Sequence, residues 1–188
     1  CINDSKLLEY HDRQWGIPIH DDLLHFEYLF LEVMQCGLNW KMMLQKREIF
    51  QKCFDNFDYY KIAKYNEEKI EEILKTEGMI KSRKKIEAII NNANAYIKII
   101  EEFGSFDKFI WNYTGGKTLI YRSHVNGNGV SKNQLSDEIS NELKNRNFKF
   151  LGSITIYSHL QACGIINDHD PNCWMFNMIE KGYPVKYI

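Results

Sequence analysis

The sequence lacks the features that would assign it to a membrane or repeat class of protein. It contains no run of eighteen apolar residues and no charged segment followed by an apolar one near its start, whereas a membrane span or a secretory leader requires such runs. Internal repeats and low-complexity linkers are also absent. We therefore expect a soluble protein without a membrane span, although the sequence begins at Cys1 rather than at a methionine.

An excess of charge of one sign is lacking as well. Lys and Arg number 24, Asp and Glu number 25, and the net charge is −1, so a nucleic-acid binder of this composition must concentrate its positive charge locally. The five cysteines are odd in number and scattered, which favours free thiols or metal ligands over a secreted disulfide framework. We expect a cytoplasmic protein whose 188 residues form one or two small domains.

The apolar residues that are present follow a helical period. Apolar side chains recur every three or four positions in 22–36, 67–76 and 83–101, which predicts three helices. A further helix is expected from about 132 to 145, and the glycine-rich segment 114–130 is expected to be an irregular loop. The segment 149–166 has β-branched residues as well as helical spacing, and we interpret it as a helix. The sequence predicts an all-α fold.

Two short segments near the chain ends carry reactive side chains. The stretch "YHDRQWGIP" (10–18) has neither strand nor long-helix periodicity, and "NDHDPNC" (167–173) holds His169 and Cys173 at a spacing found in zinc sites. Cys1 and His11 could complete a tetrahedral set, and four protein ligands make a zinc site structural because no position stays open for water. By itself the spacing is weak evidence, since a His and a Cys four apart are more often unrelated.

A basic cluster lies at the start of the 83–101 helix. Lys81, Arg83, Lys84 and Lys85 are four cations in five residues, although the positive end of the helix dipole disfavours cations there. A bound anion such as a DNA phosphate would explain the placement, and Gly78 would let the backbone approach it closely. The alternative is a solvated charge cluster on an amphipathic helix.

Glu32 is the third candidate, since it falls at the edge of the apolar face of the 22–36 helix. Together with Trp40, after the helix end at Gly37, it could line a pocket for a flat cationic ligand. The alternative is an acid whose carboxylate simply reaches solvent.

Four segments and one cysteine together resemble one known family. "YHDRQWGIP", "LEVMQCGLNWKMMLQKRE", "EGMIKSRKKIEAIINNANAY", "FKFLGSITIYSHLQACGIINDH" and the following Cys173 are similar, in order, to the bacterial 3-methyladenine DNA glycosylase I family. The resemblance implies a helical fold of the helix-hairpin-helix superfamily with one structural Zn²⁺ per chain. Its ligands would be Cys1, His11, His169 and Cys173.

The resemblance also implies roles for individual residues. Glu32 would read the base and support catalysis, Tyr10 and Trp40 would contact the flipped base, and Trp15 and Ser158 would line the pocket. Gly78, Lys81, Arg83 and Lys84 would form the DNA-phosphate contact.

The implied activity is hydrolysis of the N-glycosidic bond of 3-methyladenine in alkylated double-stranded DNA by base flipping, with free 3-methyladenine as product. The chain would act as a monomer formed of a single unit, 1–188. Its hairpin-containing part would be about 40–110, and segments 1–39 and 111–188 would pack together and share the zinc.

Some positions depart from the family pattern. Asn3 and Leu7 stand where family members usually have aromatic residues, Gln14 replaces a common glutamate, and the segment from Cys1 to His11 is shorter than usual. The departures predict that one aromatic wall of the pocket is absent.

Two alternatives from other functional classes stay open on the residues alone. A zinc-stapled DNA-binding module without catalysis could use the same basic hairpin, and a filled rather than open pocket around Glu32 would favour it. A zinc hydrolase is disfavoured because it needs an open coordination position, which four protein ligands do not leave.

Overall fold

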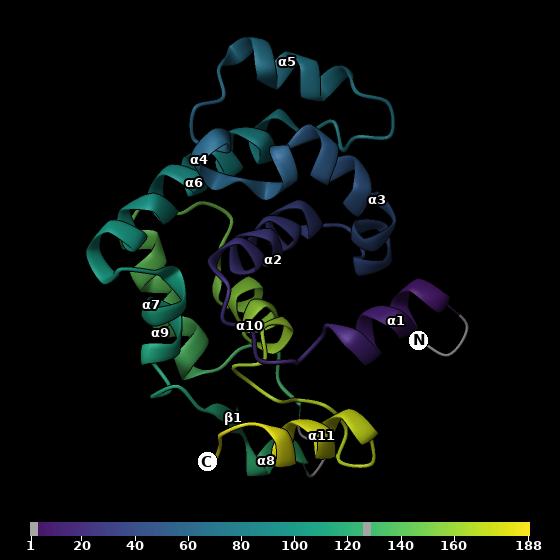
Figure 1. Cartoon of the computed structure of the whole chain (residues 1–188), viewed down its shortest axis with the longest axis vertical. Helices are drawn as coiled ribbons and strands as arrows, with labels where there is room; N and C mark the ends of the chain where they lie inside the picture. Colours follow the sequence, from purple (N-terminus) through teal and green to yellow (C-terminus); the bar gives the residue numbers. More distant parts are fainter. Residues whose placement is uncertain (1–3, 126–128) are drawn as a thin grey trace.

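The computed structural model describes residues 4–125 and 129–188. Helices account for most of these residues, and one 3-10 turn and two short strands complete the elements (Figure 1). The helices are α1 (Ser5–Arg13), α2 (Asp22–Gln35), α3 (Trp40–Cys53), α4 (Tyr59–Ile62), α5 (Glu67–Lys75), α6 (Arg83–Phe103), α7 (Phe106–Asn112), α8 (Arg122–Val125), α9 (Gln134–Asn145), α10 (Ser153–Ala162) and α11 (Trp174–Gly182). The 3-10 turn is η1 (Asp55–Phe57), and the strands are β1 (Thr118–Ile120) and β2 (Val185–Tyr187).

The helices predicted from periodicity are confirmed. α2, α5, α6 and α9 lie within two residues of their expected bounds, and the ambiguous segment 149–166 contains helix α10. Local signals fix several starts: the Asp21 carboxylate accepts a hydrogen bond from the Leu24 amide at 2.8 Å, and Asn133 and Ser136 form a reciprocal capping box at α9.

Two sequence expectations were wrong in detail. The N-terminal stretch is not irregular throughout, because α1 runs to Arg13 and is capped by the Asp4 carboxylate. Within the expected loop 114–130, the described residues form β1 and α8, and β1 pairs in parallel with β2, with Thr118 opposite Val185. The fold is therefore mostly helical rather than strictly all-α. Residues 126–128 of that expected loop lie outside the described residues.

Helix α2 is the centre of the core. Every residue from His25 to Met34 is buried, because α3, α6, α7 and α10 all pack against this helix. A helix covered on all sides has no solvent face, which explains why its apolar pattern is nearly continuous. Figure 1 shows α2 between the α3 and α6 layer on one side and α10 on the other.

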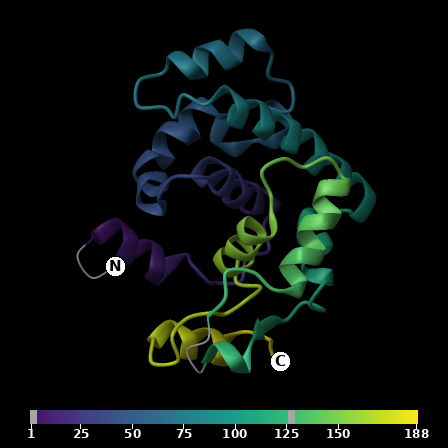
Figure 2. The same cartoon turned by 180° about the vertical axis from the view of Figure 1, so that it is seen from behind.

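The molecule has two distinct ends. α5 lies at one end and α8 and α11 lie at the other, in both views (Figures 1 and 2). Between these ends, a single cluster of buried apolar side chains draws residues from both the hairpin part and the terminal segments. No helix in the described ranges is both long enough and apolar enough to cross a membrane.

The hairpin between α5 and α6 depends on one glycine. Gly78 has φ +76°, and a Cβ there would lie 2.8 Å from Ile49 Cδ1 on α3. Both the left-handed backbone and the close contact with α3 favour glycine at this position.

Candidate active site

A cavity of about 340 Å³ opens between α1, α2, the start of α3 and α10. It is lined by Leu7, Tyr10, His11, Trp15, Glu32, Gln35, Trp40, Ser158, Gln161 and Ala162. All five residues predicted to form the catalytic and base-binding site are therefore brought together around one open space. A volume of this size suits a small, flat ligand.

Glu32 contributes the only carboxylate among the residues that line this cavity. Its side chain comes from the buried helix α2 and the residue is 3% exposed. Burial raises the pKa of Glu32 from 4.5 to about 8, and no neighbouring charge or hydrogen bond opposes that effect. Burial therefore favours the protonated carboxyl group at neutral pH, and a bound cation would favour the charged form.

Two further polar groups in the cavity wall have no partner. The Tyr10 hydroxyl and the Trp40 Nε1 are buried, and neither makes a hydrogen bond within the described residues. Their rings lie close, with centroids 5.4 Å apart and planes at 48°. Burial also raises the pKa of Tyr10 well above its usual value, so the hydroxyl stays a donor. Buried donors without acceptors cost stability, and a ligand with acceptor atoms would satisfy them.

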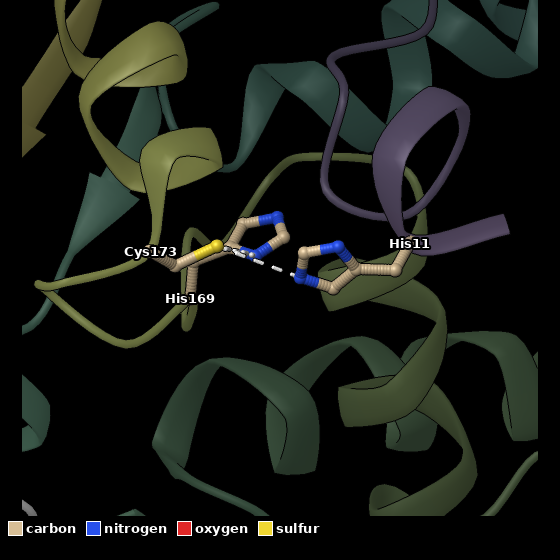
Figure 3. Close-up of side chains that lie close together, drawn as sticks. All are labelled: His11, His169 and Cys173. Carbon is tan, nitrogen blue, oxygen red and sulfur yellow. Dashed lines mark hydrogen bonds between the residues drawn. The ribbon is translucent and has the colours of Figure 1, made fainter. Parts of the chain in front are cut away.

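Next to the cavity, three side chains from the two ends of the chain converge. The Cys173 Sγ lies 3.6 Å from His11 Nε2 and 3.9 Å from His169 Nδ1 (Figure 3). The other ring nitrogens are engaged elsewhere: His11 Nδ1 lies 2.8 Å from Asp12 Oδ1, and His169 Nε2 lies 3.2 Å from the Trp15 carbonyl oxygen. Carboxylate and carbonyl partners of this kind orient metal-binding histidines.

The distances in this terminal cluster (His11, His169 and Cys173) fit a zinc ion. Zinc bonds of about 2.0–2.3 Å place tetrahedral ligand atoms about 3.3–3.8 Å apart, and the two distances from Sγ lie in or just beyond that range. Burial lowers the pKa of His169 to about 4, which keeps its ring neutral. Gly16 allows the approach, since a Cβ there would lie 2.6 Å from His169 Nε2. The fourth predicted ligand, Cys1, lies outside the described residues.

Trp15 joins the terminal cluster to the cavity. Its ring centroid lies 4.4 Å from that of His169, edge to face, and 6.2 Å from that of His11, nearly parallel. The same indole lines the cavity. His169 therefore packs against the Trp15 part of the cavity wall, while His11 also lines the cavity itself.

The four cations near the start of α6 have different environments. Arg83 pairs with Glu67, Glu71 and Glu87, and the Lys85 ammonium is buried, where it donates to the carbonyl oxygens of Met34 and Cys36 at 2.6 and 2.7 Å. These two side chains thus hold the hairpin together and cap the end of α2.

Lys81 and Lys84, in contrast, are exposed and form no ion pair within the described part of the chain. The Gly78 carbonyl oxygen accepts a hydrogen bond from Lys46 Nζ at 2.5 Å. Of the predicted phosphate contacts, Lys81 and Lys84 present free ammonium groups and Arg83 does not.

Comparisons with known proteins show the family of this chain. Residues 1–176 match the family described as methyladenine glycosylase. The chain belongs to this family. The DNA-3-methyladenine glycosylase 1 of Escherichia coli is 38% identical over 170 residues, which cover 90% of this chain and 91% of that protein. The DNA-3-methyladenine glycosylase of Haemophilus influenzae is 36% identical, with the same coverage.

Solved structures of methyladenine glycosylases have the same fold. A crystal structure of 3-methyladenine DNA glycosylase I superposes with a TM-score of 0.86 at 38% identity and covers 92% of this chain and 94% of its own. A structure that addresses 3-methyladenine recognition by the Staphylococcus aureus enzyme gives 0.87 at 34% identity, with 92% of each chain covered.

Sequence reasoning missed two polar residues of this methyladenine glycosylase pocket, Gln35 and Gln161. Gln161 lines the cavity, and its Nε2 donates to Asp168 Oδ2 at 2.9 Å. Asp168 is itself held by the Tyr157 hydroxyl at 2.5 Å and by His124 Nδ1 at 2.8 Å. The signal was present, since Gln161 follows Ser158 by three residues and so shares its face of α10.

The predicted loss of an aromatic wall concerns two positions. Leu7 lines the cavity where the family pattern usually has an aromatic side chain, so this part of the wall offers apolar contact without a ring face. Asn3 lies outside the described residues.

Proposed function

We propose that this chain is a DNA glycosylase that hydrolyses the N-glycosidic bond of 3-methyladenine in alkylated double-stranded DNA. The observation that carries the proposal is the cavity itself: a buried carboxyl group and two aromatic residues with unpartnered buried donors line one space of a size that suits a single base. Membership of the methyladenine glycosylase family, and the names of the relatives, support the same reaction.

The charge of Glu32 matches the chemistry of the substrate. Methylation at N3 makes the adenine in DNA a cation, and breaking the glycosidic bond sends the bonding electron pair to the base, which departs neutral. A cationic base entering the cavity stabilises the ionised form of Glu32, whose ionisation burial otherwise disfavours. An unmodified adenine is neutral and gives no such compensation, so the cavity selects by charge.

The second half of the reaction takes place at the sugar. Loss of the base leaves an oxocarbenium-like centre at the sugar carbon, water adds to it, and the proton of that water passes to solvent or to Glu32. The Glu32 carboxylate is the one lining group with a negative charge to stabilise this centre. Tyr10 and Trp40 hold the base by hydrogen bonding and by their ring faces, and Gln161 is positioned at the cavity wall through Asp168.

The base must leave the duplex to reach a buried cavity, and phosphate contacts hold the DNA meanwhile. In this proposal the α5–α6 turn acts as the hairpin of a helix-hairpin-helix, with Lys81 and Lys84 beside the phosphates and the Gly78 turn allowing the close approach. Arg83 shapes the turn through its three glutamates rather than by touching DNA.

A structural zinc ion forms part of the same proposal. His11, His169 and Cys173 would hold it, with Cys1 as the fourth ligand, and their donor chemistry and spacing fit the ion. Bound there, it ties α1 to the start of α11 and fixes Trp15 in the wall of the cavity. A monomeric, cytoplasmic enzyme with this single reaction completes the proposal.

The alternative of a DNA-binding module without catalysis is disfavoured by the open cavity around Glu32, since a module that only binds phosphates has no use for it.

The test is direct: duplex DNA treated with a methylating agent is incubated with the protein, and free bases are separated by chromatography. We expect release of 3-methyladenine and no adenine from untreated DNA. Tight binding of both DNAs with no base released would instead favour the binding module.

A further inference from the structure

A second cluster of metal-binding side chains lies in the core, away from the chain ends. His25 from α2, His159 from α10 and Cys163 at the end of α10 each offer a ligand atom, and these atoms lie within 4.8 Å of one another. All three residues are 0% exposed. We refer to them as the core cluster.

The ring nitrogens of the core-cluster histidines make no hydrogen bond of good geometry within the described residues. The nearest charged group to His25 Nε2 is Asp107 Oδ1 at 3.5 Å, and that oxygen also lies 2.9 Å from His20 Nδ1. Within the described residues, seven buried side-chain nitrogen and oxygen atoms lack one, and four of the seven are the ring nitrogens of His25 and His159. A neutral imidazole carries one donor and one acceptor, so each ring loses two hydrogen bonds to water when it is buried. The ring centroids lie 5.9 Å apart with the planes at 50°, and one ligand atom of each residue lies within 4.8 Å of the others. Such a concentration of unpaired polar atoms in a packed core points to a missing ligand.

Two features of the surroundings fit metal binding. His159 and Cys163 are four residues apart at the end of a helix, so both side chains project from the same face, and their spacing repeats that of His169 and Cys173 in the terminal cluster. In addition, His25 Nε2 lies 3.5 Å from Asp107 Oδ1. Metal-binding histidines typically direct their second nitrogen to a carboxylate, and Asp107 is placed to take that part.

We propose that His25, His159 and Cys163 bind a second metal ion, a thiophilic d¹⁰ cation that is either Zn²⁺ or Cu⁺. A thiolate with two imidazoles selects such ions over Mg²⁺ or Ca²⁺, which prefer oxygen ligands. On binding, the Cys163 thiol loses its proton to solvent as the metal–sulfur bond forms.

The ion would have a structural role. Ligand atoms of a tetrahedral ion lie about 3.3–3.8 Å apart, within the limit of 4.8 Å that the ligand atoms of the core cluster meet. Because no member is exposed to solvent, the ion enters during folding and leaves only when the core opens. Helix α10 also provides Ser158, Gln161 and Ala162 to the base cavity. The second ion would therefore join α2 and α10, the two helices that carry Glu32 and the opposite wall.

The test is a metal count on the whole chain. Wild type and the variants His159→Phe and Cys163→Ala are produced with added zinc, and separately loaded with Cu⁺ under anaerobic conditions, and the metal per chain is measured by mass spectrometry. Cys53→Ala is the matched control, since Cys53 is also a buried core thiol but belongs to neither cluster. Near-ultraviolet circular dichroism verifies the fold of each variant.

We expect wild type and Cys53→Ala to hold one metal equivalent more than His159→Phe and Cys163→Ala, with zinc or with copper. The arm that gives the difference identifies the ion. An equal metal content in wild type and folded His159→Phe overturns the proposal. If the variants do not fold, the proposal is overturned by a wild-type chain that holds no metal, or by one whose single equivalent is lost in Cys173→Ser. Since the terminal cluster is intact in wild type, the core-cluster variants and Cys53→Ala, loss of its zinc would not imitate the expected difference.

Discussion

Replacing Glu32 by glutamine is expected to weaken catalysis and to stabilise the protein. The substitution keeps the shape of the side chain and removes its charge. Loss of one electrostatic catalytic contact typically costs about 10² to 10³ in rate, so we expect release of 3-methyladenine from methylated DNA to fall by about that factor under single-turnover conditions. Affinity for DNA should change little, because phosphate contacts supply most of it.

The stability effect follows from the raised pKa of Glu32. In the unfolded chain this carboxyl group ionises near pH 4.5, whereas in the folded protein it ionises near pH 8. Between these values the folded state binds the extra proton, so the free energy of unfolding of wild type falls as the pH rises. At about 1.36 kcal/mol per pH unit, the full loss is about 5 kcal/mol, reached above pH 8. Relaxation of the pocket around the charge makes this an upper limit.

Glutamine has no proton to lose, so Glu32→Gln escapes this loss. At pH 5 we expect the free energy of unfolding of the variant to be only slightly higher than that of wild type. At pH 8.5 we expect it to be higher by about one to several kcal/mol. Urea unfolding followed by tryptophan fluorescence measures both values, and Glu101→Gln supplies the same chemical change at an exposed site on α6. A gain that is equal at the two pH values would refute burial as its cause. Wild-type excision by Glu32→Gln would refute the catalytic assignment.

Three further predictions concern the metal, the DNA contact and the core. Cys173→Ser should lower the zinc content by about one equivalent and reduce thermal stability, since metal affinity contributes folding free energy; unchanged zinc by elemental analysis would exclude the terminal site. Lys81→Ala and Lys84→Ala should each weaken DNA binding equally across sequences, and each should reduce the slope of log affinity against log salt concentration by about one. The exposed control Lys117→Ala should change neither quantity. Equal slopes for wild type and the variants in fluorescence anisotropy titrations would contradict the contact. Lys85→Met should cost about 1–3 kcal/mol in urea unfolding, because two buried carbonyl groups lose their donor, while a similar cost for Lys84→Met would show that the effect is not specific.

The sequence predicted the parts of the fold that depend on local pattern. α6 is long and amphipathic, so its period is readable over many residues. α1 was missed because only Tyr10 of its residues is buried, which leaves too few apolar positions to show a period. The pairing of β1 with β2 joins segments far apart in the chain, and no local signal specifies it.

The candidate site was predictable to a similar degree. Motif resemblance located Glu32, Tyr10 and Trp40, which the structure places around one cavity. It placed Arg83 among the phosphate contacts, because a sequence does not show that this side chain pairs with glutamates of α5 and α6. Likewise, the core cluster combines a histidine of α2 with residues of α10, and only tertiary packing brings them together.

The position of Trp15 has a consequence for how the sequence of this chain can evolve. One indole is in contact with both terminal histidines and also forms part of the cavity wall. Substitutions at neighbours that share a partner do not have additive effects. A mutation that reshapes the cavity for a larger base must therefore leave the packing of Trp15 against His11 and His169 intact. Conversely, substitutions near the chain ends are restricted because they change the shape of the cavity. Selection acts on these two regions as one unit, although they lie far apart in the sequence.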